Sequence, residues 1–217
     1  MKQSFFLLLV FPFLFTSCKK HDEDIKVADE LKYSADFSED DHSWLTDASH
    51  ELTPGPSGFY RMTQSQPNYQ SWGIVPYATI NYNYSISAEV KLYINAPYYG
   101  GIGLLFNYLD NNNYYAYYIR NDGTIYVFKK AGTVFTDLVN PTYSATIKTN
   151  SGQSNHVEVR QSGSVATLYV NGKSVGSCSA PRGNGLVAAG VALATSYSPN
   201  FTPLTGDFDN VSIKKIQ

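Results

Sequence analysis

The feature that most constrains this chain is a two-residue alternation of apolar and polar side chains from Ser85 to Ile94. The apolar set is Ile86, Ala88, Val90, Leu92 and Ile94, and the alternating set is Ser85, Ser87, Glu89, Lys91 and Tyr93. Successive side chains of a β-strand point to opposite faces, so this segment predicts a strand with one face in a core. A shift of one residue would expose the whole apolar set, so the register of this strand is well specified.

Turn signals divide the rest of the chain into short segments. Asn121-Asp122-Gly123, Ser162-Gly163 and Asn171-Gly172 each stand between two segments that favour strands, and such turns supply the positive φ that tight hairpins need. The predicted strands are Gly100–Tyr108, Tyr114–Arg120, Thr124–Lys129, His156–Gln161, Val165–Val170, Lys173–Cys178, Leu186–Thr195 and Asp207–Ile216. No stretch holds a convincing helical period, so the chain is predicted to be all-β, with one sandwich or barrel domain.

Composition excludes some classes of function. The 16 basic and 18 acidic residues nearly balance, and no basic stripe is present, so nucleic acid is not expected as a partner. Beyond Cys18 the only thiol is Cys178, which cannot form an internal disulfide and is predicted to be a small buried hydrophobe. The chain has 18 tyrosines, most of them between Tyr60 and Tyr143, and this residue type favours strands.

The first residues have the pattern of an export signal. Lys2 precedes the apolar run Phe5–Phe15, and the small residues Thr16-Ser17 lead directly to Cys18. At about 1.5 Å per helical residue, this run is too short to cross a hydrocarbon core of about 30 Å. The arrangement resembles a bacterial lipobox, with Phe15 in the place where the family usually has leucine. The alternative is a plain secretory signal with an incidental cysteine.

The lipobox resemblance implies where the protein would be. Residues 1–17 would be a signal peptide that is removed, and Cys18 would carry lipid that attaches the protein to a membrane. Residues 18–32 are predicted to be a flexible tether because they are charged and poor in apolar side chains. Lys19 follows the cysteine, and the acidic cluster from Asp22 to Asp24 is similar to a surface-export signal of Gram-negative glycan degraders. The expectation is an outer-membrane lipoprotein on the cell surface of a Gram-negative bacterium.

The order of the predicted strands resembles the concanavalin A-like lectin/glucanase jelly roll, including its laminin-G-like branch, over residues 33–217. Four segments carry the resemblance: Gly101–Phe106, Asn112–Tyr117 with Asp122-Gly123, Asn155–Val159 with Leu168–Gly172, and Gly206–Val211. The resemblance implies a two-sheet antiparallel sandwich with one concave sheet. Lectins and glucanases of this fold use the concave face or the loops at its rim.

The acidic residues do not form a glucanase motif. Retaining glycosidases need two carboxyl groups about 5–5.5 Å apart, and the usual glucanase signature alternates three acids on one strand. Glu89 stands among serines and a lysine, and Glu158 stands near Arg160. The four histidines are scattered without metal-ligand spacing, so catalytic residues are not assigned.

Calcium is a candidate cofactor because many proteins of this fold hold one structural Ca²⁺ near the closing strand. Asp207 and Asp209, with Glu39 or Asp36, would supply the oxygen ligands that calcium prefers. The alternative is that the Asp-Phe-Asp-Asn segment only aligns the last strand.

The aromatic cluster supplies the candidate ligand-binding residues. In Tyr114–Arg120, alternation puts Tyr115, Tyr117 and Ile119 on one face and Tyr114, Ala116, Tyr118 and Arg120 on the other. Flat rings with polar groups nearby suit a glycan, whereas the alternative is ordinary packing between strands. The candidates are Trp72, Tyr98, Tyr99, Tyr114, Tyr118, Arg120 and Tyr126. Alternation alone does not say which face is open.

Three functions remain open on this reading. The first is a non-catalytic lipoprotein that binds carbohydrate and holds glycan near the cell. The second is a glycoside hydrolase or lyase with an atypical acid and base, for which Glu89 and Glu158 are the candidates. The third is a structural or adhesive protein with partners in the cell envelope.

Overall fold

The computed structural model describes residues 29–40, 43–76, 79–94, 100–183, 185–196 and 202–217. Within them the chain forms fourteen strands and no helix. The strands are β1 (Glu30–Ala35), β2 (His50–Thr53), β3 (Phe59–Gln64), β4 (Gln70–Ile74), β5 (Tyr84–Tyr93), β6 (Gly100–Asp110), β7 (Asn113–Arg120), β8 (Thr124–Ala131), β9 (Val134–Tyr143), β10 (Ser154–Ser162), β11 (Val165–Val170), β12 (Lys173–Ser179), β13 (Ala188–Thr195) and β14 (Leu204–Lys215). The predicted signal peptide and Cys18 lie outside the described residues, as does the tether up to residue 28.

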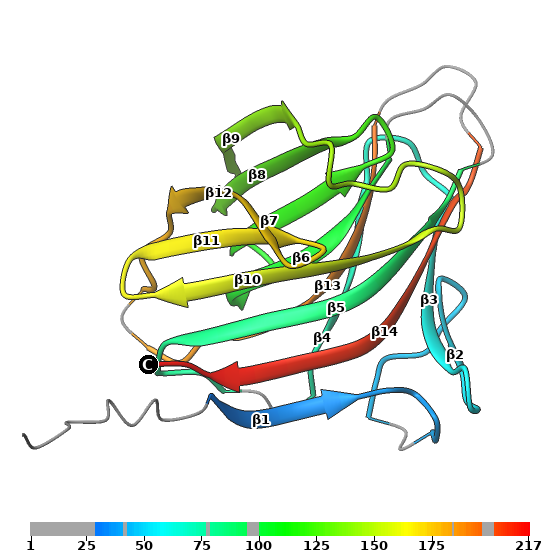
Figure 1. The fold of residues 1–217 in the computed structure, drawn as a ribbon, viewed down its shortest axis with the longest axis horizontal. Helices are drawn as coiled ribbons and strands as arrows, with labels where there is room; N and C mark the ends of the chain where they lie inside the picture. Colours follow the sequence, from blue (N-terminus) through cyan, green and yellow to red (C-terminus); the bar gives the residue numbers. More distant parts are fainter. Residues whose placement is uncertain (1–28, 41–42, 77–78, 95–99, 184, 197–201) are drawn as a thin grey trace, which may run out of the picture.

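The strands form two antiparallel sheets that pack face to face (Figure 1). Sheet A has eight strands in the order β12-β11-β10-β5-β14-β3-β2, and β1 also pairs with β14. Sheet B has six strands in the order β4-β13-β6-β7-β8-β9. The predicted all-β, two-sheet sandwich is therefore confirmed.

The sequence-based strands and hairpins agree closely with the structure. The alternating segment forms β5, which lies between β10 and β14 in sheet A, and Ile86 and Val90 are fully buried. Each predicted hairpin turn joins two paired strands, and Gly123, Gly163 and Gly172 all have positive φ. Local turn chemistry and alternation were sufficient to predict these strands.

Two edge features differ from the sequence-based expectation. Strand β1 begins at Glu30 and pairs with the end of β14, so residues 30–32, which the sequence pattern placed in the tether, belong to the folded domain. Strand β9 has no predicted counterpart because its side chains are largely exposed and do not alternate. It lies at the edge of sheet B and contains Pro141, a residue that edge strands tolerate because one side of the strand has no partner.

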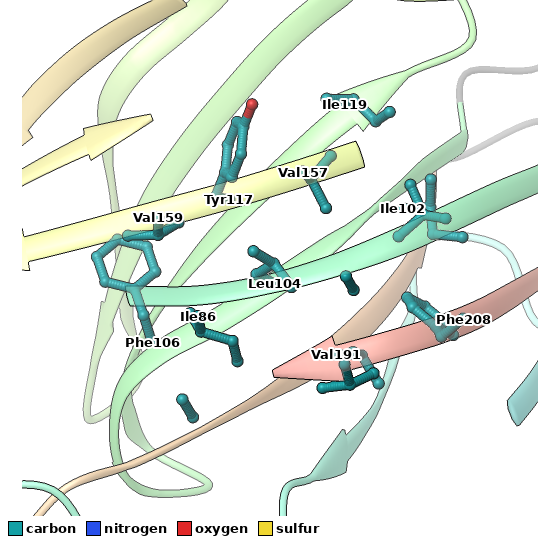
Figure 2. Packing of buried hydrophobic residues seen from close by; sticks show 14 of the residues in the cluster. Ile86, Ile102, Leu104, Phe106, Tyr117, Ile119, Val157, Val159, Val191 and Phe208 are labelled. Carbon is teal, nitrogen blue, oxygen red and sulfur yellow. The ribbon is translucent and has the colours of Figure 1, made fainter. Parts of the chain in front are cut away.

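The main core fills the space between the two sheets. Figure 2 shows Val157 of β10 and Phe208 of β14 in sheet A together with Leu104 of β6 and Val191 of β13 in sheet B. All four side chains are completely buried. Burial of a side chain of this kind contributes about 1.5–3 kcal/mol, so contact between the sheets is the main source of stability.

Residues outside the main strands also close the core. Trp44 is 4% exposed and packs against Phe37 and Tyr60, with ring centroids 5.3 Å and 4.9 Å away. Its indole Nε1 donates a hydrogen bond to the Tyr33 hydroxyl at 2.7 Å. Cys178 is half-buried against the core, and burial raises the pKa of its thiol to about 11, so it is not an activated nucleophile. Among the described residues, no helix has the length and hydrophobicity needed to cross a membrane.

Glycine is required where β6 approaches β7. A Cβ at Gly103 would lie 1.9 Å from the Tyr117 carbonyl oxygen, whereas a Cβ at Gly183 would meet nothing within 4 Å. We expect Gly103→Ala to lower the free energy of unfolding by about 1–3 kcal/mol, because forced contact outweighs the entropy gained by replacing glycine. Gly183→Ala should leave it nearly unchanged. Chemical denaturation of both variants checks this, and equal midpoints would contradict the close approach.

Candidate functional site

Strand β7 determines which aromatic side chains enter the core and which face outward. Tyr115, Tyr117 and Ile119 belong to the core cluster between the sheets. Tyr114 and Tyr118 belong to a second cluster that contains only sheet B side chains, and this cluster lies on the outer face of sheet B. The alternation predicted from the sequence is therefore correct, and the structure assigns each set to its face.

The outer face of sheet B carries a groove of about 760 Å³. Five of the seven candidate residues line it together: Trp72 from β4, Tyr114, Tyr118 and Arg120 from β7, and Tyr126 from β8. The other two candidates, Tyr98 and Tyr99, lie outside the described residues. Trp72 and Tyr114 are distant in sequence, yet they meet in this groove because β4 and β7 belong to the same sheet.

Phe128 of β8 lies at the centre of the aromatic surface. Its ring stacks on that of Tyr118, with centroids 6.1 Å apart and an interplanar angle of 21°. It also contacts Tyr126 and Phe135, with centroid distances of 5.7 and 5.5 Å. The candidate residues did not include Phe128, although its alternation with Ile125 and Val127 placed it on the same face as Tyr126. These mutual contacts hold the rings in fixed positions.

The rings at the other side of the groove are also paired. Trp72 packs at a tilt against Tyr114, with centroids 5.7 Å apart. Trp72 is half-buried, so part of the indole surface remains accessible from the groove. Gly101 of β6 also lines the groove beside Tyr118, and the absence of a side chain there leaves room for the ring.

Polar groups surround these rings. The Tyr114 hydroxyl donates to Gln70 Oε1 at 2.9 Å, and the Tyr126 hydroxyl donates to Asp137 Oδ1 at 2.5 Å. Arg120 forms an ion pair with Asp122 at 3.5 Å and lines the groove on the side of the β7–β8 turn. The groove therefore combines apolar ring surface with amide, carboxylate and guanidinium groups.

The hydroxyl of Tyr118 stands out among these polar groups. Tyr118 is 2% exposed, and its hydroxyl has no hydrogen-bond partner among the described residues. An unsatisfied buried polar group of this kind costs about 1–3 kcal/mol. The groove floor thus contains a polar atom without a partner in the described part of the chain.

Burial makes the groove tyrosines harder to ionise than an exposed tyrosine. It raises the pKa of Tyr114 to about 12. It also raises the pKa of Tyr126, an effect that the Asp137 carboxylate increases, and it raises the pKa of Tyr118 well above the usual value. At neutral pH these hydroxyls are neutral hydrogen-bonding groups and not phenolates.

The calcium candidates make hydrogen bonds and ion pairs within the protein. Both Asp207 carboxylate oxygens accept hydrogen bonds from Arg61, Nε to Oδ1 at 2.7 Å and Nη2 to Oδ2 at 2.8 Å, and Tyr93 donates to Oδ2 at 2.8 Å. Asp36 Oδ1 accepts from the backbone nitrogen and hydroxyl of Ser38. Within the described ranges no three His, Cys, Asp or Glu side chains gather closely enough to hold a metal ion. Asp207 thus joins β14 to β3 through an ion pair with Arg61 and to β5 through a hydrogen bond from Tyr93.

Asp209, the second calcium candidate, pairs with Glu89 of β5 across sheet A. Burial raises the pKa of Asp209, and the nearby carboxylates of Asp36 and Glu89 add to this effect. Glu89 itself accepts hydrogen bonds from Ser154 Oγ at 2.7 Å and contacts His156 Nδ1 at 3.1 Å. Glu158 pairs with Arg160 at 2.9 Å. Glu89, Glu158 and Asp209 all belong to sheet A, whereas the aromatic groove lies on sheet B.

Comparison with known proteins agrees with this architecture. The model of a family described as the concanavalin A-like lectin/glucanases superfamily matches residues 67–216, and the chain belongs to this family. A search of curated protein sequences finds no significant relative.

Solved structures share the fold at low sequence identity. The carbohydrate binding module of Bacillus subtilis is 14% identical, with a TM-score of 0.60, over 80% of this chain and 96% of that protein. The β-glucanase of Bacillus licheniformis is 12% identical, with a TM-score of 0.57, over 85% and 98%. The xylan β-1,4-xylosidase of Bacillus halodurans is 15% identical, with a TM-score of 0.58, over 86% of this chain but only 40% of the enzyme. The fold is thus shared by a binding module and by enzymes, so it does not by itself choose between binding and catalysis.

The raised pKa of Tyr114 predicts a loss of stability at high pH. In the unfolded chain a tyrosine ionises near pH 10, whereas in the folded protein Tyr114 ionises at about 12. Its contribution to stability is therefore complete below about pH 10 and is lost as the pH rises through about 12. We expect Tyr114→Phe to reduce the slope of unfolding free energy against pH in this range.

Denaturation curves at several alkaline pH values measure that slope. Trp72→Phe is the matched control, because it changes the neighbouring ring without removing an ionisable hydroxyl. A Tyr114→Phe variant with the same alkaline slope as the parent would show that this hydroxyl ionises normally in the folded state.

Proposed function

We propose that this protein is a lipid-anchored, surface-exposed, non-catalytic carbohydrate-binding protein that holds glycan near the cell. The observation that carries the proposal is the aromatic groove on the outer face of sheet B. It supports binding because the rings are large, partly accessible and held rigidly by their neighbours.

The chemistry of the groove suits a sugar. A pyranose ring has apolar C–H faces that stack on an aromatic ring and hydroxyls at its edge that form hydrogen bonds. Trp72 and Tyr126 provide accessible ring surface, and Gln70 and Asp137 provide polar atoms beside those rings. The volume of about 760 Å³ lies within the usual range of ligand sites.

The comparisons add support of a coarser kind. A carbohydrate binding module has the same fold over nearly its whole length, and the family includes lectins and glucanases by description. The non-catalytic part of the proposal comes from the acids, since none of those named as catalytic candidates lines the groove.

Single ring deletions test the groove. Trp72→Ala and Tyr126→Ala should each weaken retention of the purified full chain in polysaccharide-containing native gels. We expect a weakening of about fivefold to tenfold, because loss of one stacked ring corresponds to about 1 kcal/mol or slightly more. Tyr143→Ala is the matched control, since Tyr143 is 72% exposed and does not line the groove.

The same polysaccharide panel separates the rival functions. Absence of retention by every polysaccharide would overturn the proposal. Release of reducing or unsaturated products, abolished by Glu89→Gln or Glu158→Gln, would favour the hydrolase or lyase alternative. Capture of envelope proteins without any glycan would favour the adhesive alternative.

The lipid anchor has its own test, for which the chain contains an internal control. Cells that express the full chain and receive labelled palmitate should produce a labelled protein in the membrane fraction. Cys18→Ala should abolish the label, whereas Cys178→Ala should retain it, because only Cys18 follows the signal-like segment. Surface exposure is checked by whether external protease digests the protein on intact cells. Label that persists in Cys18→Ala would refute lipidation at this residue.

A further inference from the structure

A second cavity lies beside the aromatic groove, at the end of sheet B where β7 begins and β8 ends. It has a volume of about 330 Å³ and is bordered by the β6–β7 turn and by residues that precede β13. Tyr114 and Lys130 line both this cavity and the groove. The groove and the second cavity therefore adjoin at these two side chains.

The second cavity is basic. Lys129, Lys130 and Arg182 line it, and no Asp or Glu is among its described lining residues. The nearest acid of the β6–β7 turn is Asp110, whose Oδ1 accepts hydrogen bonds from the Asn112 backbone and from Asn113 Nδ2, at 2.7 and 3.0 Å. That carboxylate is thus engaged within its own turn.

The three cations contact neutral groups. Lys130 Nζ donates to the Asn111 carbonyl oxygen at 2.7 Å and lies 5.7 Å from the Tyr114 ring centroid. Lys129 Nζ lies 5.6 Å from the Tyr115 ring centroid, and Arg182 Nη1 donates to the Tyr82 carbonyl oxygen. In the part of the chain that the structure describes, none of the three forms a salt bridge with a carboxylate. An ammonium has three N–H donors and a guanidinium has five, so donors remain for a ligand.

The three cations of this cavity contrast with the net charge of the whole chain. The formal net charge is −2, so the protein as a whole does not attract polyanions. Binding of an anionic ligand would therefore depend on the site where cations gather. Because this site continues from the aromatic groove, the ligand would carry both sugar rings and negative charge.

We propose that the ligand is an acidic polysaccharide, whose carboxylate or sulfate groups occupy the cavity at Lys129, Lys130 and Arg182 while neighbouring sugar rings stack in the groove. This inference rests on the proposed carbohydrate-binding function and specifies its substrate class. Charge-assisted hydrogen bonds to such groups are stronger than neutral ones, so they would select acidic over neutral sugars.

The test compares polysaccharides that differ only in charge. Polygalacturonate is paired with its methyl-esterified form, and dextran sulfate is paired with dextran, which separates carboxylate from sulfate recognition. We expect the purified full chain to bind the acidic member of at least one pair about tenfold more tightly, with affinity that falls as salt is added. Equal binding of the charged and neutral members of both pairs would overturn the inference.

Substitutions test whether the preference for acidic polysaccharides depends on the cations of this cavity. Lys129→Gln combined with Arg182→Gln should reduce affinity for the acidic form to that for its neutral partner, whereas Lys173→Gln, an exposed lysine on β12, should change nothing. A matching loss in Lys173→Gln would show general charge attraction and would overturn the inference. Denaturation midpoints confirm that each variant is folded.

The outcomes for this cavity and for the groove are distinguishable. One outcome is that neutral polysaccharides bind, that Trp72→Ala weakens this binding, and that the double variant leaves affinity unchanged. In that case the acidic-ligand inference fails while the carbohydrate-binding function stands. If neither charged nor neutral polysaccharides bind, both fail. If acidic binding is lost in the double variant and weakened in Trp72→Ala, the two cavities act as one site.

Discussion

Burial of the inner faces of the two sheets against each other is the constraint on which the rest of this structure depends. Because side chains alternate along a strand, each residue assigned to the core also assigns its neighbours to the outer face. In β7, burial of Tyr117 between the sheets places Tyr118 on the outer face of sheet B. The candidate site is therefore a direct consequence of the same alternation that builds the core, and a shift in register would destroy both.

This dependence explains what could be predicted from the sequence. The strand at Ser85–Ile94, the hairpin at Asn171-Gly172 and the two faces of β7 all rest on local signals, namely alternation and turn residues that allow positive φ. Sheet membership was inferable only through the family resemblance. That β4 lies close enough to β7 for Trp72 to contact Tyr114 is a property of strand order, which no local pattern carries.

The features that sequence analysis missed are those set by tertiary contacts. Asp207 was a calcium candidate because the family resemblance implies a structural Ca²⁺ near the closing strand. In the fold, Arg61 of β3 and Tyr93 of β5 donate hydrogen bonds to its carboxylate. Phe128 was not among the candidate residues, because its central position depends on rings from β7 and β9. Strand β9 lacks alternation because most of its side chains are exposed and only Leu138 and Val139 pack against the core, so it could not be predicted from apolar periodicity.

The outer face of sheet B is more apolar than stability alone requires. A sheet in a sandwich needs one buried face, and its other face is usually polar because it meets water. Here the outer face holds a second aromatic cluster, and within it the Tyr118 hydroxyl lacks a partner among the described residues. Phenylalanine at this position would avoid the cost of the unpaired hydroxyl, whereas tyrosine keeps a polar atom beneath the groove. Local departures of this kind from the simplest stable choice tend to occur at functional sites, and this one coincides with the groove that the strand order creates.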